Sequence, residues 1–415
     1  MPSSAGRYYW ILLAAIFLLS LVIRAGITAR FQGLSSPPNA SANPDALEYE
    51  LIAYNLANGD GYGFRPGVPT ASRPPGIPLA LVVPYLLTGR SFLAAHWWII
   101  LISSATCLVV AWLGTLCGGR CLGLVAAGWL ALYPGHFYYS MHFLSEPVYG
   151  FWLALACGLS IWAFRRHRYG GDAAAGVAWA FAILTRVEMI MVIPIAWVLL
   201  TAVSRQARRP VYRHAAVQTA VALAIVSLWA GRNFVSMGAP SLSTQRGYAF
   251  WGSHNRLTMS DPRYIGSWVT VVEMDRATHP LTGAEVERDR QAFEYGVATV
   301  RENLSRMPFV TVMKIWRFAS PFFETPNRAA LLALALGWIV TAPFVVYGLW
   351  VAFAGGAQDR LLWSVPLAPM LATVGMSAIF YGSHRFRDAL APLFVLFAAY
   401  GALRLTERLT GRHPC

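Results

Sequence analysis

The chain has 415 residues, of which 56% are hydrophobic and 13% are charged, and its mean hydropathy is +0.48. Soluble domains carry about 25% charged residues, so this composition excludes an ordinary soluble protein and predicts an all-α polytopic membrane protein. The net charge is +14, but the arginines are spread over short loops and form no single basic domain, which argues against a nucleic-acid partner.

Apolar runs predict about 10–11 transmembrane helices, because each crossing takes about 20 residues. The first run, at 8–28, is expected to be a retained span, since no small-residue cleavage site follows it. The short basic loops at 165–171 and 204–214 indicate the cytoplasmic side. Residues 29–95 therefore form the first external loop. Segment 74–89 is short and contains several prolines, so we expect it to be interfacial or re-entrant.

The later apolar runs alternate in direction across the membrane. They are expected at 96–117, 121–137, 148–164, a short pair between 171 and 204, 215–231, 329–354, 361–381 and 388–404. This map divides the chain into an N-terminal transmembrane module with the first external loop (1–230), a larger external loop region (231–328), and C-terminal transmembrane helices with a short cytoplasmic tail (329–415).

The larger external loop region is predicted to contain a helix at 282–308. Thr282 and Glu285 have the spacing of a capping box at its start, and apolar residues then recur at helical intervals. The following segment, 307–323, carries Trp and Phe side chains, so we expect it to lie along the membrane surface.

Carboxylates gather in the first external loop, which is unusual for a chain with only 19 acidic residues. Asp45 stands at the start of a predicted helix, and Glu146 precedes Pro147 at the start of another. Each has two interpretations that the spacing alone does not decide: a helix-start residue favoured by the helix dipole, or a general base or metal ligand. His136 and His142 lie near Glu146 in the sequence, but the spacing matches no standard metal site.

A basic cluster, "GSHRFRD" at 382–388, lies on the external side of the map, where the positive-inside bias disfavours it. Arginine binds phosphate through forked hydrogen bonds, so Arg385 and Arg387 are candidate phosphate ligands. The alternative is that their side chains only reach the membrane interface. Two other external arginines, Arg73 and Arg232, accompany them.

Several segments, taken in chain order, resemble one family of membrane enzymes. They are "PDALEYELIAYNLANGDGYGF" with "ASRPPGIPLAL", "LYPGHFYYSMHFLSEPVYGFWLALA", "AFAILTRVEMIMVIPIAW", "LWAGRNFVSMGAPSLSTQRGYAFWGSHN" and "HRFRDALAPLFVLFAAYGAL". Together they resemble the protein O-mannosyltransferase and lipid A aminoarabinose transferase superfamily, which consists of GT-C-type membrane glycosyltransferases.

The resemblance implies a GT-C-like bundle with interfacial helices in the first external loop. It implies that a sugar moves from a polyprenyl (undecaprenyl or dolichyl) phosphate to a lipid, glycan or protein acceptor. The reaction would be inverting and would take place on the extracytoplasmic side of a bacterial inner membrane. Asp45 matches the catalytic base, and Glu146 the acidic position of the second external loop. Arg385 and Arg387 match the donor phosphate site, with help from Arg232 or Arg73.

The remaining expectations concern the pocket and its cofactors. The substrate-pocket candidates are Glu48, Tyr49, Tyr62, His142, Asn233, His254 and Asn255. No cofactor is certain, and a divalent metal is an open alternative. Its candidate ligands are Asp45, His136, His142 and Glu146.

Three alternative functions stay open at this point. A secondary transporter would bury ionisable residues near the membrane midplane, and Arg186 with Glu188 is the best such pair in the sequence. A non-catalytic membrane subunit would bind a lipid-linked sugar for a partner enzyme. A polymer ligase of similar architecture would take a diphosphate-linked donor.

Overall fold

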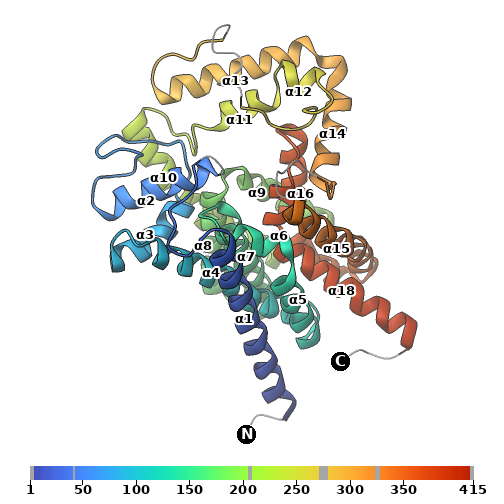
Figure 1. Cartoon of the computed structure of the whole chain (residues 1–415). Coiled ribbons are helices and arrows are strands. Elements are labelled where there is room, and N and C mark those ends of the chain that lie inside the picture. Colours follow the sequence, from blue (N-terminus) through green and yellow to red (C-terminus); the bar gives the residue numbers. More distant parts are fainter. Residues whose placement is uncertain (1–3, 41–42, 204–207, 271–278, 323–327, 412–415) are drawn as a thin grey trace.

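The structure is a computed structural model of the chain, and it describes all residues apart from 1–3, 41–42, 204–207, 271–278, 323–327 and 412–415. The elements are helices, and the one β pairing among the described residues is an isolated bridge between Arg65 and Val68. This confirms the prediction of an all-α protein. Figure 1 shows a bundle of long helices with a layer of shorter helices at one end, while both chain termini lie toward the opposite end.

Six helices in the described part of the chain are long and apolar enough to cross a membrane. They are α1 (Ser4–Phe31), α4 (Phe92–Gly118), α7 (Ser145–Arg166), α10 (Arg208–Met237), α15 (Arg328–Ala354) and α16 (Ala357–Ile379). Four more fall where the sequence predicts crossings: α5 (Arg120–Leu132), α8 (Tyr169–Thr185), α9 (Val192–Val203) and α18 (Ala391–Thr410). The chain is therefore a multi-pass membrane protein whose helices match the predicted crossings in position.

The first external loop folds into two shorter helices, α2 (Pro44–Ala57) and α3 (Gly76–Thr88), which lie beside the bundle in Figure 1. Ile77 of α3 is fully buried in an apolar cluster that includes Ala53 of α2 and Ile99 of α4. Helix α3 has 13 residues, a length of about 20 Å, whereas the hydrocarbon core is about 30 Å thick. Helix α5 is equally short, so length alone does not distinguish α3 from a crossing, and its place at the interface stays a prediction.

The outer layer consists of five short elements that lie together at the top of Figure 1. They are α11 (Arg246–Ser253), α12 (Arg256–Ser260), α13 (Glu285–Glu302), η3 (Leu304–Arg306) and α14 (Met307–Ala319). The predicted capping box is wrong, because α13 begins at Glu285 and Ala284 occupies its N-cap without a side-chain bond. The carboxylate of Glu285 instead accepts hydrogen bonds from Thr70, from the backbone N–H of Ala71 and from Thr244. A tertiary contact has replaced the local one.

The first half of helix α18, residues 391–399, is buried inside the bundle, whereas residues 404–410 are mostly exposed. A helix that is apolar all round belongs inside a bundle. Gly348 of α15 allows close packing here, because a Cβ atom at that position would collide with the carbonyl group of Phe397. Two short helices precede long ones at the end of the bundle that faces the outer layer: α6 (Pro134–Tyr139) before α7, and α17 (His384–Ala389) before α18.

Candidate functional site

Seven charged side chains from distant parts of the sequence meet and alternate in sign. They come from α2, the loop before α3, α17, the start of α7, the turn after α8, and the 3-10 helix η1 (Val187–Met191). In order they are Glu48, Arg73, Asp45, Arg385, Glu146, Arg186 and Glu188. We call this set the charge ladder.

One half of the charge ladder, Glu48, Arg73, Asp45 and Arg385, is partly exposed to solvent. Asp45 lies between the two arginines of this half. Its Oδ1 atom is 2.6 Å from Nη2 of Arg73, and its Oδ2 atom is 3.2 Å from Nη1 of Arg385. Arg73 also donates from Nε to Oε2 of Glu48 at 2.5 Å. The side chains of Asp45 and Arg385 are 27% and 34% exposed. A ligand can therefore reach both partners of this ion pair.

The other half of the charge ladder is buried. Arg385 donates from Nε to Oε1 of Glu146 at 2.8 Å, and Nη2 of Arg186 lies 3.5 Å from the same oxygen. Arg186 also donates to the Ser145 hydroxyl at 3.1 Å and lies 3.9 Å from Glu188. The side chain of Glu146 is 3% exposed. This half can hold Arg385 in place but offers a ligand little surface.

The electrostatics of Asp45 follow from these contacts. Burial acts to raise the pKa of Asp45, but the positive charges of Arg73 and Arg385 outweigh it and hold the pKa below the ordinary value. Burial acts to lower the pKa of Arg385, but the carboxylates of Glu146 and Asp45 outweigh it and raise this pKa above its ordinary value. Both groups are therefore ionised at neutral pH. Asp45 becomes a stronger base only when its arginine partners are shared with another anion.

Local sequence explains how these groups are positioned. Pro44 opens α2 and places Asp45 in its first turn, where the helix dipole favours a carboxylate. Ser383 caps α17 by accepting a hydrogen bond from the backbone N–H of Arg385. The backbone of Arg73 is held by the Tyr62 hydroxyl, which donates to its carbonyl at 2.8 Å, and its guanidinium lies 5.5 Å from the ring of Tyr49. Tyr49 and Tyr62 thus border the charge ladder.

Arg232 and Asn233, at the end of α10, lie beside the first external loop. Arg232 donates to the carbonyls of Thr70 at 2.7 Å and Tyr62 at 3.0 Å. It also donates to the side chain of Asn233, which in turn donates to the carbonyl of Ser241. These contacts hold the loop that carries Arg73, and they leave Arg232 outside the charge ladder.

Arg387 belongs to a second set of side chains, which we call the buried cluster: the buried Arg387, Asp388 and Tyr133, and the partly buried Trp338. Nε of Arg387 is 3.1 Å from Oδ1 of Asp388, and its guanidinium lies 4.7 Å from the Trp338 ring. Tyr133 donates to Asp388 at 3.1 Å. Arg387 also donates to the carbonyl of Ser320. The structure therefore places the two predicted phosphate ligands of α17 in different surroundings.

The remaining pocket candidates lie in other contacts. In the outer layer, Asn255 caps α12, and Nε2 of His254 is 2.8 Å from Nζ of the buried Lys314. Burial lowers the pKa of His254 to about 4 and that of Lys314 to about 7. His142 is partly buried, 6.1 Å from the Tyr138 ring, and burial lowers its pKa to about 4. With a pKa of about 4, both histidines are uncharged at neutral pH.

The four metal-ligand candidates do not form one cluster. The structure places no three or more His, Cys, Asp or Glu side chains, among the residues it describes, where they could hold a metal ion. Arg385 lies between Asp45 and Glu146. Nδ1 of His136 is instead 2.6 Å from Nη2 of the buried Arg24. The residues present therefore do not fit the metal set that the sequence left open.

Sequence reasoning did not assign Arg186 and Glu188 to the site. It treated them as a transporter-like pair, although they lie within the segment "AFAILTRVEMIMVIPIAW" that contributes to the family resemblance. That resemblance is the signal in the sequence from which both residues could have been assigned to the site. Their role in the charge ladder depends on how α7 packs against α8, which brings Arg186 to Glu146.

Comparison with known proteins identifies the fold. No protein-family profile matches the chain, and no curated protein sequence matches it. Solved structures do match, among them the archaeal oligosaccharyltransferase AglB from Archaeoglobus fulgidus in complex with an inhibitory peptide and a dolichol-phosphate. The identity is 14%, the TM-score is 0.58, and the match covers 98% of this chain and 52% of that one. The apo form of this enzyme matches at 14% identity, a TM-score of 0.59 and 97% and 51% coverage.

A third similar structure is ArnT from Cupriavidus metallidurans bound to undecaprenyl phosphate. It matches at 14% identity and a TM-score of 0.48, over 97% of this chain and 79% of that one. The chain spans about half the length of the oligosaccharyltransferase chains. The match to these chains along nearly the whole sequence shows that this protein has the GT-C fold of membrane glycosyltransferases, as its sequence segments predict.

Proposed function

We propose that this protein is a membrane glycosyltransferase that moves a sugar from a polyprenyl phosphate to an acceptor on the extracytoplasmic side of the membrane. The observation that carries this proposal is the position of Asp45. It is a partly exposed carboxylate held between Arg73 and Arg385 at the end of a GT-C bundle. A base beside two phosphate-binding side chains is what transfer from a phosphate-linked sugar requires.

The proposed reaction is a single displacement. Asp45 takes the proton of the acceptor hydroxyl or amine as that group forms a bond to the anomeric carbon. The bond between this carbon and the phosphate oxygen breaks, and its electron pair leaves with the polyprenyl phosphate. Arg385 and Arg73 stabilise the negative charge that develops on this phosphate. Attack from the face opposite the leaving group inverts the anomeric configuration.

The charge balance of the ladder adds a condition to this reaction. Its four carboxylates exceed its three guanidiniums by one. A donor phosphate therefore competes with Asp45 for Arg385 and Arg73 instead of adding to an excess of positive charge. Once the phosphate occupies these arginines, their hold on Asp45 weakens and its pKa rises. Donor binding thus converts Asp45 from an ion-pair partner into a base.

A lateral groove offers room for the polyprenyl chain. It lies between α5, α6 and α15, encloses about 1130 Å³ of partly open space, and is lined by apolar residues such as Leu132 and Leu336. Tyr133 lines this groove and also hydrogen bonds to Asp388 of α17. Since α17 also carries Arg385, a chain in the groove would end close to the charge ladder. Of the matched proteins, the AglB structure contains a dolichol-phosphate.

The transporter alternative is not favoured. Arg186 and Glu188, its best pair in the sequence, are part of the charge ladder, and they lie in the turn after α8. Transport sites are built from ionisable groups near the membrane midplane. The ladder instead gathers residues from the ends of helices and from the first external loop.

Donor turnover in lipid discs tests the proposal. A panel of labelled polyprenyl monophosphate sugars is supplied with cell-extract acceptors, and release of polyprenyl phosphate is followed. We expect Asp45→Asn to lower the rate by about 10²–10⁴-fold and Arg385→Ala by about 10²–10³-fold. Asp60→Asn is a matched control, because it makes the same change at an exposed position of the same loop. It should stay within about twofold of wild type.

Two outcomes would overturn the proposal. Normal turnover by Asp45→Asn would remove this residue as the base. A wild-type protein that binds a donor without ever releasing polyprenyl phosphate would be the non-catalytic subunit. A second panel of polyprenyl diphosphate-linked sugars resolves the donor class, because turnover of one of these in preference to every monophosphate would indicate the ligase alternative.

A further inference from the structure

A second cavity extends along α9 from Val192, about one turn after Glu188 of the charge ladder, toward the other end of the bundle. Its walls come from α7, α8, α9, α10 and α16, and it is partly open to the surroundings. Ser160 of this wall lies 14 residues after Glu146 on α7, a separation of about 21 Å along the helix. This part of the cavity is therefore well separated from Glu146 of the candidate active site.

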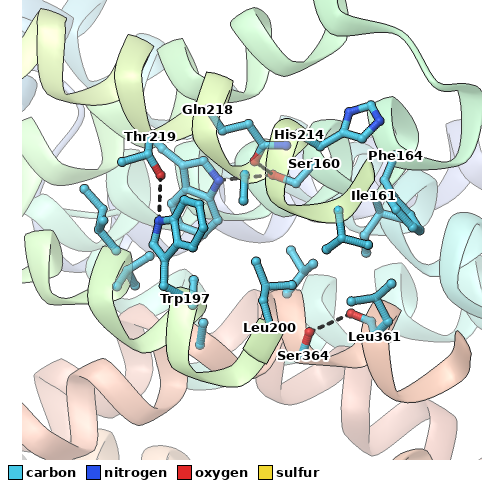
Figure 2. A pocket seen from close by; sticks show the side chains of 18 of the residues that line it. Ser160, Ile161, Phe164, Trp197, Leu200, His214, Gln218, Thr219, Leu361 and Ser364 are labelled. Carbon is cyan, nitrogen blue, oxygen red and sulfur yellow. Dashed lines mark hydrogen bonds between the residues drawn. The ribbon is translucent and has the colours of Figure 1, made fainter. Parts of the chain in front are cut away.

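The cavity presents a hydrocarbon surface. Figure 2 shows Trp197, Leu200, Ile161 and Leu361 around the open space, with Ser160, Gln218 and His214 along one edge. The polar side chains of the wall already form hydrogen bonds within the protein.

Their hydrogen bonds run along the wall. Ser160 bonds to Gln218 at 2.7 Å and accepts from the Trp179 ring N–H at 3.1 Å. Thr219 accepts from Trp197, and Ser364 donates to the carbonyl of Leu361. A pocket of this kind, whose polar groups need no further partner, suits an apolar guest better than water or a polar metabolite.

The charge beside the cavity is positive. Phe164 lines the cavity, and three exposed arginines follow it directly or within one turn: Arg165, Arg166 and Arg168. A fourth exposed arginine, Arg213, adjoins His214 of the wall. Within the described residues none of these four arginines forms an ion pair with a carboxylate.

The carboxylates near this end do not cancel that charge. Asp172 is fully buried and already accepts hydrogen bonds from Nδ1 of His214 at 2.5 Å and from Gln218 at 2.7 Å. Asp359, two residues before Leu361 of the wall, is exposed. One exposed carboxylate thus stands against four exposed arginines.

From this combination we propose that the cavity binds the hydrocarbon chain of an anionic membrane phospholipid, whose phosphate lies among Arg165, Arg166, Arg168 and Arg213. The apolar wall selects the hydrocarbon chain, and the arginines select the headgroup. Each arginine contributes about fivefold in affinity. The lipid fills space between α9 and its neighbours α10 and α16, and it stabilises their packing. This site is distinct from donor binding and does not depend on the proposed transferase activity.

Photolabelling of the purified full-length protein tests the proposal. The probes are phosphatidylglycerol and phosphatidylcholine with the same acyl chain and a diazirine at the chain end, in mixed detergent micelles. We expect phosphatidylglycerol to label the cavity wall near Trp197 and Leu200 at least about fivefold more than phosphatidylcholine does. Val346 is exposed on α15 and lines neither the cavity nor the lateral groove. Its labelling serves as the reference for general lipid contact and should not depend on the headgroup.

Two variants sharpen the result. Ala196→Trp adds a large side chain to the cavity wall and should abolish labelling there while α15 is still labelled. The fourfold change Arg165→Gln, Arg166→Gln, Arg168→Gln and Arg213→Gln should remove the preference, so that phosphatidylglycerol and phosphatidylcholine label the cavity wall equally. The matched control removes two exposed arginines from α18, Arg404→Gln and Arg408→Gln, and should leave the preference unchanged.

The site and the headgroup assignment are each contradicted by a different result. Cavity labelling that is no stronger than at Val346, or that persists in Ala196→Trp, would overturn the site. Equal labelling by the two lipids in the wild type would overturn the headgroup assignment. Thermal unfolding with added phosphatidylglycerol gives an independent reading, because a lipid bound only to the folded protein must raise the melting temperature. Inorganic phosphate alone should not raise it, since the chain provides the binding to the apolar wall.

Discussion

Arg385 and Arg387 stand two positions apart in α17 and belong to very different regions. Arg385 is 34% exposed and bonds to Asp45 and Glu146, which come from α2 and α7. Arg387 is fully buried and bonds to its neighbour Asp388 and to a backbone carbonyl. Side chains two residues apart point to nearly opposite faces of a helix. One short motif therefore supplies both the charge ladder and the buried cluster.

The difference lies in whether the partners can be exchanged. In the exposed half of the charge ladder, Arg73 and Arg385 contact Asp45, which is partly open to solvent, so an incoming phosphate can take the place of this carboxylate. In the buried cluster, Arg387 is enclosed by Asp388 and Trp338, and no ligand can replace either of them without opening the bundle. The first arrangement suits binding and chemistry, and the second suits structure.

The largest expected effect concerns stability in the buried cluster. Arg387→Ala leaves the carboxylate of Asp388 buried without its cation, and breaking a buried pair in this way costs about 3–5 kcal/mol. Arg385→Ala should cost less than half of this, because Asp45 and Glu146 retain Arg73 and Arg186. Denaturant unfolding of both variants in the same detergent measures the contrast. Equal losses in the two variants would show that the regions do not differ as proposed.

A smaller effect is expected on activity in the charge ladder. Arg385→Lys retains the positive charge but loses the fork that reaches Asp45 and Glu146 at once. Loss of one charge-assisted hydrogen bond is worth about 1.5–3 kcal/mol, so kcat/KM for donor release should fall by about 10–100-fold with a near-normal melting temperature. Arg387→Lys is the matched control. It should lower the melting temperature more and the activity of the folded fraction less.

The pH dependence should separate the two regions further. Burial raises the pKa of Asp388, and Arg387 and Tyr133 offset this only in part. A carboxyl group with a higher pKa in the folded than in the unfolded protein adds stability as the pH falls through its folded pKa. In Arg387→Ala this pKa rises further. The stability loss should therefore be smaller at about pH 5 than at about pH 8.

Asp45 should behave in the opposite way. Burial acts to raise its pKa, but Arg73 and Arg385 outweigh burial and lower it. Its stabilising contribution is then complete above about pH 4 and is lost only as the pH falls through the lower folded pKa. The loss caused by Arg385→Ala should stay constant between about pH 8 and about pH 5. Thermal unfolding at both pH values checks this, and the same pH trend in both variants would contradict the comparison.

The sequence predicted the parts of this comparison that depend on local pattern. Apolar runs located the helices, and the order of the motifs identified the GT-C fold. Asp45, Glu146 and Arg385 were chosen as candidates, and the structure brings all of them together. Arg387 was assigned with Arg385 because the two share a motif, but the helical periodicity of α17 sends them to different regions.

Other expectations failed because tertiary contacts decide them. Glu285 has the spacing of a capping residue, but the first external loop uses its carboxylate instead. His136 has the chemistry of a metal ligand, but the packing of α1 places Arg24 against it. Neither contact leaves a trace in local spacing, because the partners are more than 100 residues apart in the sequence.

The smallest expected effect concerns how far the charge ladder depends on the outer layer. Glu285 of α13 accepts hydrogen bonds from Thr70 and from the backbone N–H of Ala71, just before Arg73. Glu285→Gln keeps the shape but replaces one acceptor oxygen with a donor group, so it should loosen this part of the loop. Donor turnover should fall by about tenfold, which corresponds to about 1.4 kcal/mol.

Glu287→Gln is the control for this effect, because Glu287 lies on the same helix and pairs only with exposed or partly exposed side chains, Arg290 and Gln291. Such surface pairs contribute about 0–1 kcal/mol, and turnover should not change. If Glu285→Gln also leaves turnover unchanged, the contacts of Arg73 with Tyr62 and Glu48 are sufficient to place it. The charge ladder would then be positioned within the first external loop and the bundle alone, and the outer layer would not contribute to catalysis through Arg73.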